Sequence, residues 1–155
     1  MAVGTVSGVN QTDNWQLISS VTPSSTAVTF NSISGYSRLM VVYKVMTTSA
    51  NAWIYLRVNN DATAGNYSSM SAYTSADQLS SNNYIVLNGT LQSSHSGLVV
   101  IENTDKSVPH QISDLVSLVV SQYSAAILLA SPITRVDILG GTFTGGTVEL
   151  WGVAA

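Results

Sequence analysis

Two runs of alternating apolar side chains, residues 39–46 and 53–58, constrain the fold more than any other stretch of the sequence. Successive side chains of a β-strand point to opposite faces, so each run gives a strand with one face that can be buried. The polar residues 47–51 between the runs have the length of a hairpin loop. The Asn-Asn-Asp sequence at 59–61 tolerates left-handed backbone geometry and ends the second strand. We therefore predict a central β-hairpin over residues 38–61.

The rest of the chain repeats this pattern in shorter form. Strands are predicted at residues 15–21, 27–31, 84–87, 90–92, 98–102, 133–139 and 147–153. The dipeptide Asn88-Gly89 predicts a second hairpin, because it suits a two-residue turn. Residues 112–120 and 125–130 fit either a helix or a strand, and their β-branched content favours strands. The polar residues 62–81 predict a long loop.

Roughly eight to ten short strands separated by turn residues predict an all-β protein, a single β-sandwich that is jelly-roll-like. A chain of 155 residues is most simply one domain and buries about 70% of the surface of its unfolded form. We expect residues 15–155 to form the sandwich and residues 1–14 to form a short extended N-terminal arm. Val3, Val6 and Val9 fit no strand or helix period. The arm is then either poorly ordered or ordered against a partner that buries these valines.

Charged residues make up only 8% of the chain, against about 25% in typical soluble domains. Ser and Thr hydroxyls, from about a quarter of the residues, must therefore form much of the wetted surface. A weakly charged surface repels neighbouring molecules poorly, so we expect a homo-oligomer. The formal net charge of −3 offers no basic surplus to neutralise phosphates, which argues against a nucleic-acid partner.

The sequence shows no signal for a membrane or for export. No apolar run approaches the roughly 18 residues of a membrane span, and the first residues lack the basic start and apolar core of a secretory signal. We therefore expect synthesis in a cytoplasm without export by the general route, and no membrane partner. The absence of cysteine excludes disulfides and thiolate metal sites.

Residues that could carry catalysis are few. His95 and His110 are the only histidines, and a catalytic base would also need an orienting acid and a nucleophile. Glu102 and Glu149 are the best residues for a small glycosidase, yet nothing in the spacing of the acidic residues selects a pair. We predict no enzymatic activity, no catalytic residue, no cofactor and no metal site.

Aromatic residues are candidates for sugar binding, because exposed rings bordered by amides and hydroxyls form platforms for sugars. Trp53 and Tyr55 lie in a well-patterned strand, which favours a place in the core. Tyr67 and Tyr73 lie in the polar stretch and are candidate glycan contacts.

Three groups of residues, taken together, resemble a known family. They are WQLI at 15–18 with VTF at 28–30 and ISGY at 33–36; LRVNND at 56–61 with GNY at 65–67; and ITRV at 133–136 with GTF at 141–143 and GTVELWG at 146–152. Their order resembles β-sandwich modules of tailed-bacteriophage virion proteins, found among capsid decoration (cement) proteins and tail-fibre or spike domains.

The resemblance implies a jelly-roll-like homotrimer that binds a capsid or a cell-surface glycan without catalysis. It also implies that Arg57, Asn60, Asp61 and Tyr67 pin the loop after the strand at 53–58, and that the strand at 146–152 closes a sheet. The chain shows no coiled-coil stalk and no enzymatic domain, so a free-standing module fits a decoration protein better than a long fibre.

We therefore expect a non-enzymatic structural protein of a bacteriophage virion, most simply a capsid decoration protein. It would bind itself and the major capsid protein, with Val3, Val6 and Val9 as candidate contacts, on the capsid surface rather than the tail. The alternative is a glycan- or receptor-binding module of a tail fibre or spike that uses Tyr67 and Tyr73. A small glycosidase is a third, weaker hypothesis.

Overall fold

The structure, a computed structural model, describes residues 14–71, 79–87, 91–103, 108–116, 119–128 and 131–155. These residues contain strands and no helix. The strands are β1 (Gln16–Val21), β2 (Ala27–Phe30), β3 (Tyr36–Ala52), β4 (Tyr55–Val58), β5 (Tyr67–Ser71), β6 (Leu79–Asn82), β7 (Ile85–Val86), β8 (Gln92–Glu102), β9 (Val108–Val116), β10 (Val119–Ile127), β11 (Val136–Leu139) and β12 (Phe143–Ala154).

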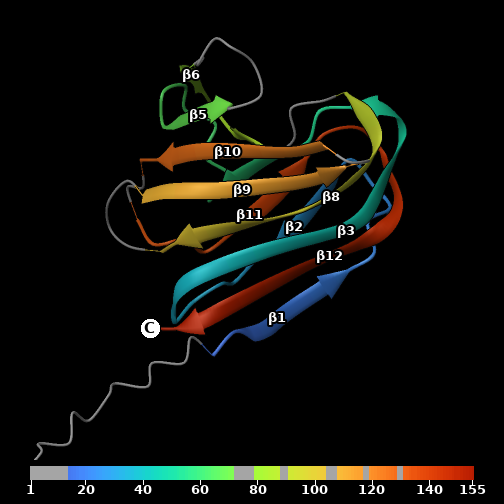
Figure 1. Ribbon diagram of the computed structural model, residues 1–155. Helices are drawn as coiled ribbons and strands as arrows, with labels where there is room; N and C mark the ends of the chain where they lie inside the picture. The colour runs from blue at the N-terminus through green and yellow to red at the C-terminus, as the bar shows by residue number, and fades with distance from the viewer. Residues whose placement is uncertain (1–13, 72–78, 88–90, 104–107, 117–118, 129–130) are drawn as a thin grey trace, which may run out of the picture.

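The strands form two antiparallel sheets that pack face to face (Figure 1). The large sheet has eight strands in the order β1-β12-β3-β8-β9-β10-β5-β6. The small sheet has four, in the order β2-β11-β4-β7. Figure 1 shows β2 and β11 of the small sheet behind β3 and β8 of the large sheet.

The strand order is that of a jelly roll with two insertions. The four strands β1-β12-β3-β8 face the four strands β2-β11-β4-β7. In each set a strand from the beginning of the chain lies next to one from its end, β1 beside β12 and β2 beside β11, as in a jelly roll. The remaining strands enter as β5 and β6 between β4 and β7, and as β9 and β10 between β8 and β11. Both insertions extend the large sheet beyond β8. The predicted all-β, jelly-roll-like sandwich is therefore confirmed.

One apolar core fills the space between the sheets. Its members from the large sheet include Leu39, Val41, Tyr43, Val148 and Leu150, and those from the small sheet include Leu56, Val58, Val136 and Ile138; each is at most 1% exposed. Burying one such aliphatic side chain contributes about 1.5–3 kcal/mol. Because side chains alternate along a strand, these inward positions also determine which residues point outward.

The predicted central hairpin is wrong. β3 continues through the predicted loop at 47–51 and pairs with β12 and β8 in the large sheet. β4 pairs with β11 and β7 in the small sheet. The chain therefore crosses from one sheet to the other at Trp53 and Ile54. Alternation predicts a buried face for each strand, but it does not say which strand lies beside it.

Other connections also differ from the prediction. β7 pairs with β4, whereas β8 pairs with β3 and β9, so the strands on either side of Asn88-Gly89 lie in different sheets; the dipeptide itself lies outside the described residues. The polar residues 62–81 contain β5 and most of β6, and these two strands pair at one edge of the large sheet. Of the two stretches 112–120 and 125–130, β9 and β10 confirm the preference for strand over helix at residues 112–116, 119–120 and 125–127, whereas residues 117–118 and 129–130 lie outside the described part of the chain.

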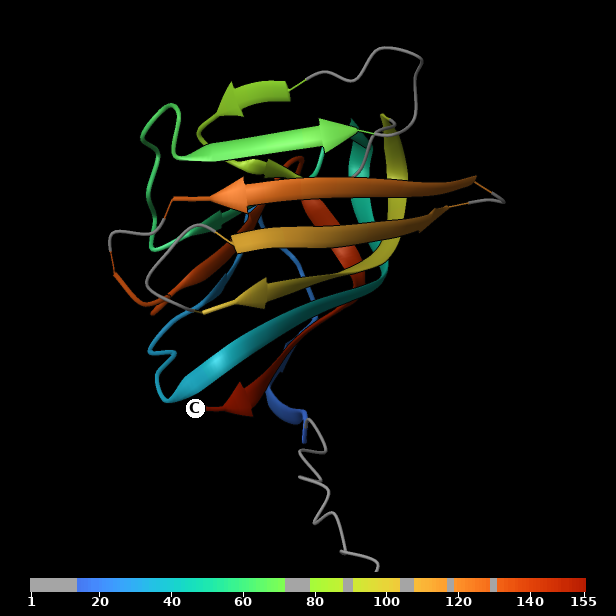
Figure 2. The ribbon, with the colours of Figure 1, turned by 60° about the vertical axis from the view of Figure 1, so that its left-hand side comes forward.

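β3 and β12 bend at a common point. Val45 has φ 46°, and the pairing of β3 with β8 shifts between Tyr43 and Met46. Opposite this bulge lies Gly146, with φ 91°, where the pairing of β12 with β3 also shifts. A Cβ on Gly146 would lie 2.2 Å from the carbonyl oxygen of Val45, so only glycine lets the backbones approach this closely. Figure 2 shows β3 and β8 curving at one end of the sandwich.

Gly146→Ala should lower the free energy of unfolding by about 2–5 kcal/mol, because it combines a strained backbone with a steric clash. Gly35→Ala is the matched control. Gly35 also has positive φ, 75°, but an added Cβ would have nothing within 4 Å, so the expected loss is only about 1–2 kcal/mol. Urea unfolding followed by tryptophan fluorescence measures both. Equal losses in the two variants would contradict the close approach of β3 and β12.

Candidate functional site

A row of apolar side chains crosses the outward face of the large sheet. Leu17, Trp151, Met40 and Val100 lie opposite one another in the register of β1, β12, β3 and β8. Directly paired residues point to the same face, with Cβ atoms about 4.5–5.5 Å apart. Leu17 is 51% exposed and the other three are half-buried. The row is therefore a continuous apolar strip on the outside of the sandwich.

Neighbouring residues widen this strip. Val42 pairs with Leu98 on one side of it, and Val153 pairs with Arg38 on the other. We call the resulting set the outer patch: Leu17, Met40, Val42, Leu98, Val100, Trp151 and Val153. A contiguous exposed apolar patch on a soluble domain typically marks a contact surface, and tryptophan and methionine are enriched at the centres of protein interfaces.

Two ion pairs border the outer patch. Arg38 Nε donates to Glu102 Oε1 at 2.7 Å at one end, and Lys44 Nζ donates to Glu149 Oε1 at 2.8 Å at the other. Trp151 Nε1 donates to the second carboxylate oxygen of Glu149 at 3.0 Å. The hydrogen bonds from Lys44 and then Trp151 hold the pKa of Glu149 below its usual range. An apolar centre with a polar rim is the common arrangement of protein interfaces.

The residues named for a glycosidase belong to this rim. Glu102 ends β8 and Glu149 lies on β12, with β3 between the two strands. Each carboxylate forms an ion pair with its own cation from β3, Glu102 with Arg38 and Glu149 with Lys44. Among the described residues, no three His, Cys, Asp or Glu side chains are grouped as metal ligands would be.

The two histidines lie on neighbouring strands. His95 is on β8 and is fully buried, so it is an inward-facing residue of that strand. His110 is on β9, where its side chain lies outside what the structure describes.

Tyr67 is a core residue. Its side chain is 0% exposed, and its hydroxyl accepts a hydrogen bond from Val58 N at 3.2 Å and donates one to the Asp61 carbonyl at 3.0 Å. The ring is not available to a sugar, so the predicted glycan contact at Tyr67 is wrong. Tyr73, Val3, Val6 and Val9 lie outside the described residues.

The loop after β4 is pinned from several directions. The carboxylate of Asp61 accepts hydrogen bonds from Thr63 N at 2.9 Å and from Asn66 Nδ2 at 2.7 Å, and the Tyr67 hydroxyl closes the loop. Asn60 has φ 55°, as expected at a turn. This bears out the implied role of Asp61 and Tyr67, whereas Arg57 contacts a different segment.

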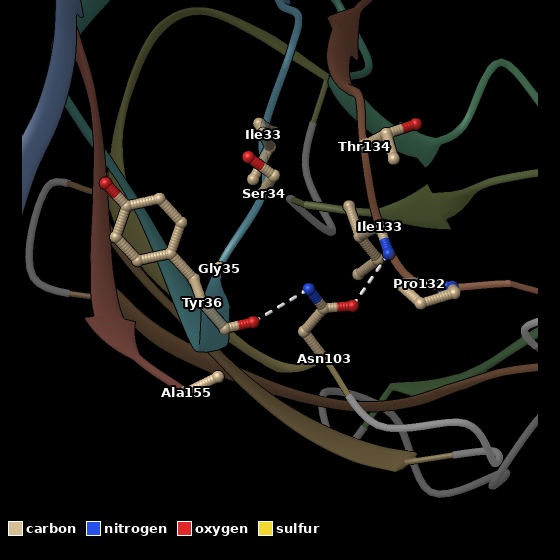
Figure 3. Close-up of a pocket in the computed structure, with 9 residues that line it drawn as sticks. All are labelled: Ile33, Ser34, Gly35, Tyr36, Asn103, Pro132, Ile133, Thr134 and Ala155. Carbon is tan, nitrogen blue, oxygen red and sulfur yellow. Dashed lines mark hydrogen bonds between the residues drawn. The ribbon is translucent and has the colours of Figure 1, made fainter.

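A pocket of about 290 Å³ lies at the end of the sandwich where the chain ends (Figure 3). It is lined by Ile33, Ser34, Gly35, Tyr36, Asn103, Pro132, Ile133, Thr134 and Ala155. Asn103 Nδ2 donates to the Tyr36 carbonyl at 2.9 Å, and Asn103 Oδ1 accepts from Ile133 N at 2.7 Å. The side-chain amide thus ties the start of β3 to the segment before β11. None of the described residues that line the pocket has a charged side chain.

No protein-family model matches the chain, and no curated protein matches it in sequence. None of the described segments forms a helix with the length and hydrophobicity that a membrane span requires.

The outer patch is the feature that sequence reasoning missed. Its signal lay in the second face of the first apolar run, where Met40 and Val42 alternate with the core residues. In the sequence that face looks partly apolar and partly charged, because Arg38 and Lys44 lie on either side of Met40 and Val42. Only the register brings Leu17, Trp151 and Val100 beside them.

Tyr67→Phe should lower the free energy of unfolding by about 1–3 kcal/mol, because it leaves buried backbone groups of Val58 and Asp61 without their partner. Tyr36→Phe is the control. Within the described part of the chain the Tyr36 hydroxyl makes no hydrogen bond, and its removal should cost less than about 0.5 kcal/mol. Chemical unfolding of both variants provides the measurement, and similar losses would show that the Tyr67 hydroxyl does not hold the loop.

Proposed function

We propose that this protein is a structural component of a bacteriophage virion, most simply a decoration protein that binds the capsid surface as a homo-oligomer. The observation that carries the proposal is the outer patch, an apolar surface on a domain with only 8% charged residues. The jelly-roll topology adds support, since this fold is common among viral capsid proteins.

The outer patch would be covered by copies of the chain or by capsid subunits. Removing apolar surface from water would drive the contact, at about 25 cal/mol per Å² before the costs of association. The ion pairs Arg38–Glu102 and Lys44–Glu149 lie at the rim, where charged groups mainly set orientation and partner choice. A protein bound across neighbouring subunits stabilises the assembled form by mass action. This role needs no catalytic group.

The N-terminal arm adds to the same contact. The described chain begins at Asn14, two residues before β1, and β1 supplies Leu17 to the outer patch. The described chain therefore begins close to the edge of this patch. We propose that Val3, Val6 and Val9 contribute further apolar surface to the partner.

Leu98→Asp should weaken both self-association and capsid binding by at least about tenfold, because it places a charge within the apolar surface of the contact. Leu128→Asp is the matched control, since Leu128 is 59% exposed at the end of β10, outside the outer patch, and Leu98 is 39% exposed. Sedimentation velocity measures self-association. Co-sedimentation with expanded, undecorated capsids of the virus that encodes the chain measures binding.

A monomeric wild type that does not sediment with capsids would overturn the proposal. Equal effects of the two aspartate substitutions would show that the outer patch is not the contact. Unchanged capsid affinity after deletion of residues 2–13 would show that the N-terminal arm is not part of the contact. Immunogold labelling of the tail rather than the capsid would favour the fibre or spike alternative.

A further inference from the structure

The outward face of the small sheet carries arginine and tyrosine side chains, on the opposite side of the sandwich from the outer patch. Thr29, Asp137 and Arg57 lie side by side across β2, β11 and β4. Arg135 precedes Asp137 by two residues and shares its face, and Tyr55 precedes Arg57 in the same way. We call Tyr55, Arg57, Tyr84 and Arg135 the arginine–tyrosine face.

Arg135 is held rigidly by a buried carboxylate. The side chain of Asp137 is 2% exposed, and it accepts a hydrogen bond from Thr29 Oγ1 at 2.6 Å. Arg135 donates to it from Nε at 2.8 Å and from Nη2 at 2.8 Å. The carboxylate is thus satisfied, while 38% of the arginine side chain faces solvent. A guanidinium fixed by two such bonds loses little further freedom when it binds a ligand.

Arg57 presents a guanidinium beside this pair. Its Nε donates to the Asn83 carbonyl at 3.2 Å, which fixes the head group. Within the described part of the chain, no carboxylate lies within the 4.0 Å of an ion pair with Arg57. Asp61 lies in the next loop, but Thr63 and Asn66 occupy its oxygens. Hydrogen bonds from Asn66 and Thr63, and then the charge of Arg57, lower the pKa of Asp61, so among the described residues Arg57 has a nearby negative charge but forms no ion pair.

Two tyrosine rings continue the face beside Arg57. The centroids of Tyr55 and Tyr84 are 4.2 Å apart with the planes tilted by 45°, and both side chains are half-buried. Tyr84 directly follows Asn83, so one short segment fixes both the second ring and the arginine. Ring faces carry partial negative charge and attract the polarised C–H groups on one side of a sugar ring.

We propose that the arginine–tyrosine face binds a carboxylated sugar of an acidic polysaccharide. The sugar ring would lie on the tyrosine pair, and its carboxylate would accept paired hydrogen bonds from Arg57, with Arg135 adding positive charge. A neutral sugar would leave the Arg57 donors unused. The proposal goes beyond the structural role and does not depend on it, because the free protein would bind. A domain attached through the outer patch would turn this face outward.

Isothermal titration calorimetry and NMR titration of the full chain with oligogalacturonate test the proposal. Millimolar or tighter binding is expected, weakening with added salt, with the largest backbone shifts in β4 and in residues 83–86. Maltotriose, a neutral sugar, and triglutamate, a carboxylate ligand without a sugar ring, should both bind at least about tenfold more weakly.

Arg57→Gln should weaken oligogalacturonate binding by at least about tenfold. Arg57→Lys should weaken it by less, since lysine keeps the positive charge but cannot donate the paired hydrogen bonds of a guanidinium. Tyr84→Ala should also weaken binding. Arg38→Gln, on the opposite sheet, should leave it unchanged. Absence of shifts at millimolar oligogalacturonate, equal binding of triglutamate, or full binding by Arg57→Gln would each overturn the proposal. An NMR spectrum showing that the Arg57→Gln variant is folded ensures that its loss of binding is caused by the missing guanidinium and not by unfolding.

Discussion

Burial of the inward side chains between the two sheets is the constraint on which the other features depend. Leu39, Val41 and Tyr43 of β3 face Leu56 and the other small-sheet residues across one core. A shift of one residue in any of these strands would exchange the buried and exposed sets. The core therefore positions Met40 and Val42 on one outer surface, and it positions Tyr55 and Arg57 on the other.

Much of the fold could be predicted from local patterns, because each strand needs one apolar face. The strands near 15–21, 27–31, 98–102 and 147–153 follow from alternation alone. Their partners could not be predicted in this way, since sheet pairing joins residues far apart in the sequence. β3 lies between β12 and β8 rather than beside β4, and no local signal distinguishes a hairpin from a crossing between sheets.

The candidate sites were harder to predict than the strands. Tyr67 lies in a polar stretch, yet its ring enters the core because backbone groups of Val58 and Asp61 satisfy its hydroxyl. Tyr55 lies in an apolar run, yet it points outward because Leu56 takes the inward position. In both cases the strand register decided the orientation, and the composition of the surrounding sequence gave the opposite indication.

The two outer surfaces differ in chemistry, and this difference suggests a division of roles. The large sheet presents the outer patch with ion pairs at its rim, a surface suited to stable contact with protein. The small sheet presents fixed guanidinium groups and tyrosine rings, a surface suited to polar ligands. Because a sandwich has its outer faces on opposite sides, one can be attached while the other remains accessible.

A cryo-electron microscopy map of the protein in its assembled form tests this division most directly. The outer face of β1, β12, β3 and β8 should be covered by a neighbouring subunit, and that of β2, β11 and β4 should face solvent. A map in which the outer patch is exposed while the small sheet forms the contact would contradict it.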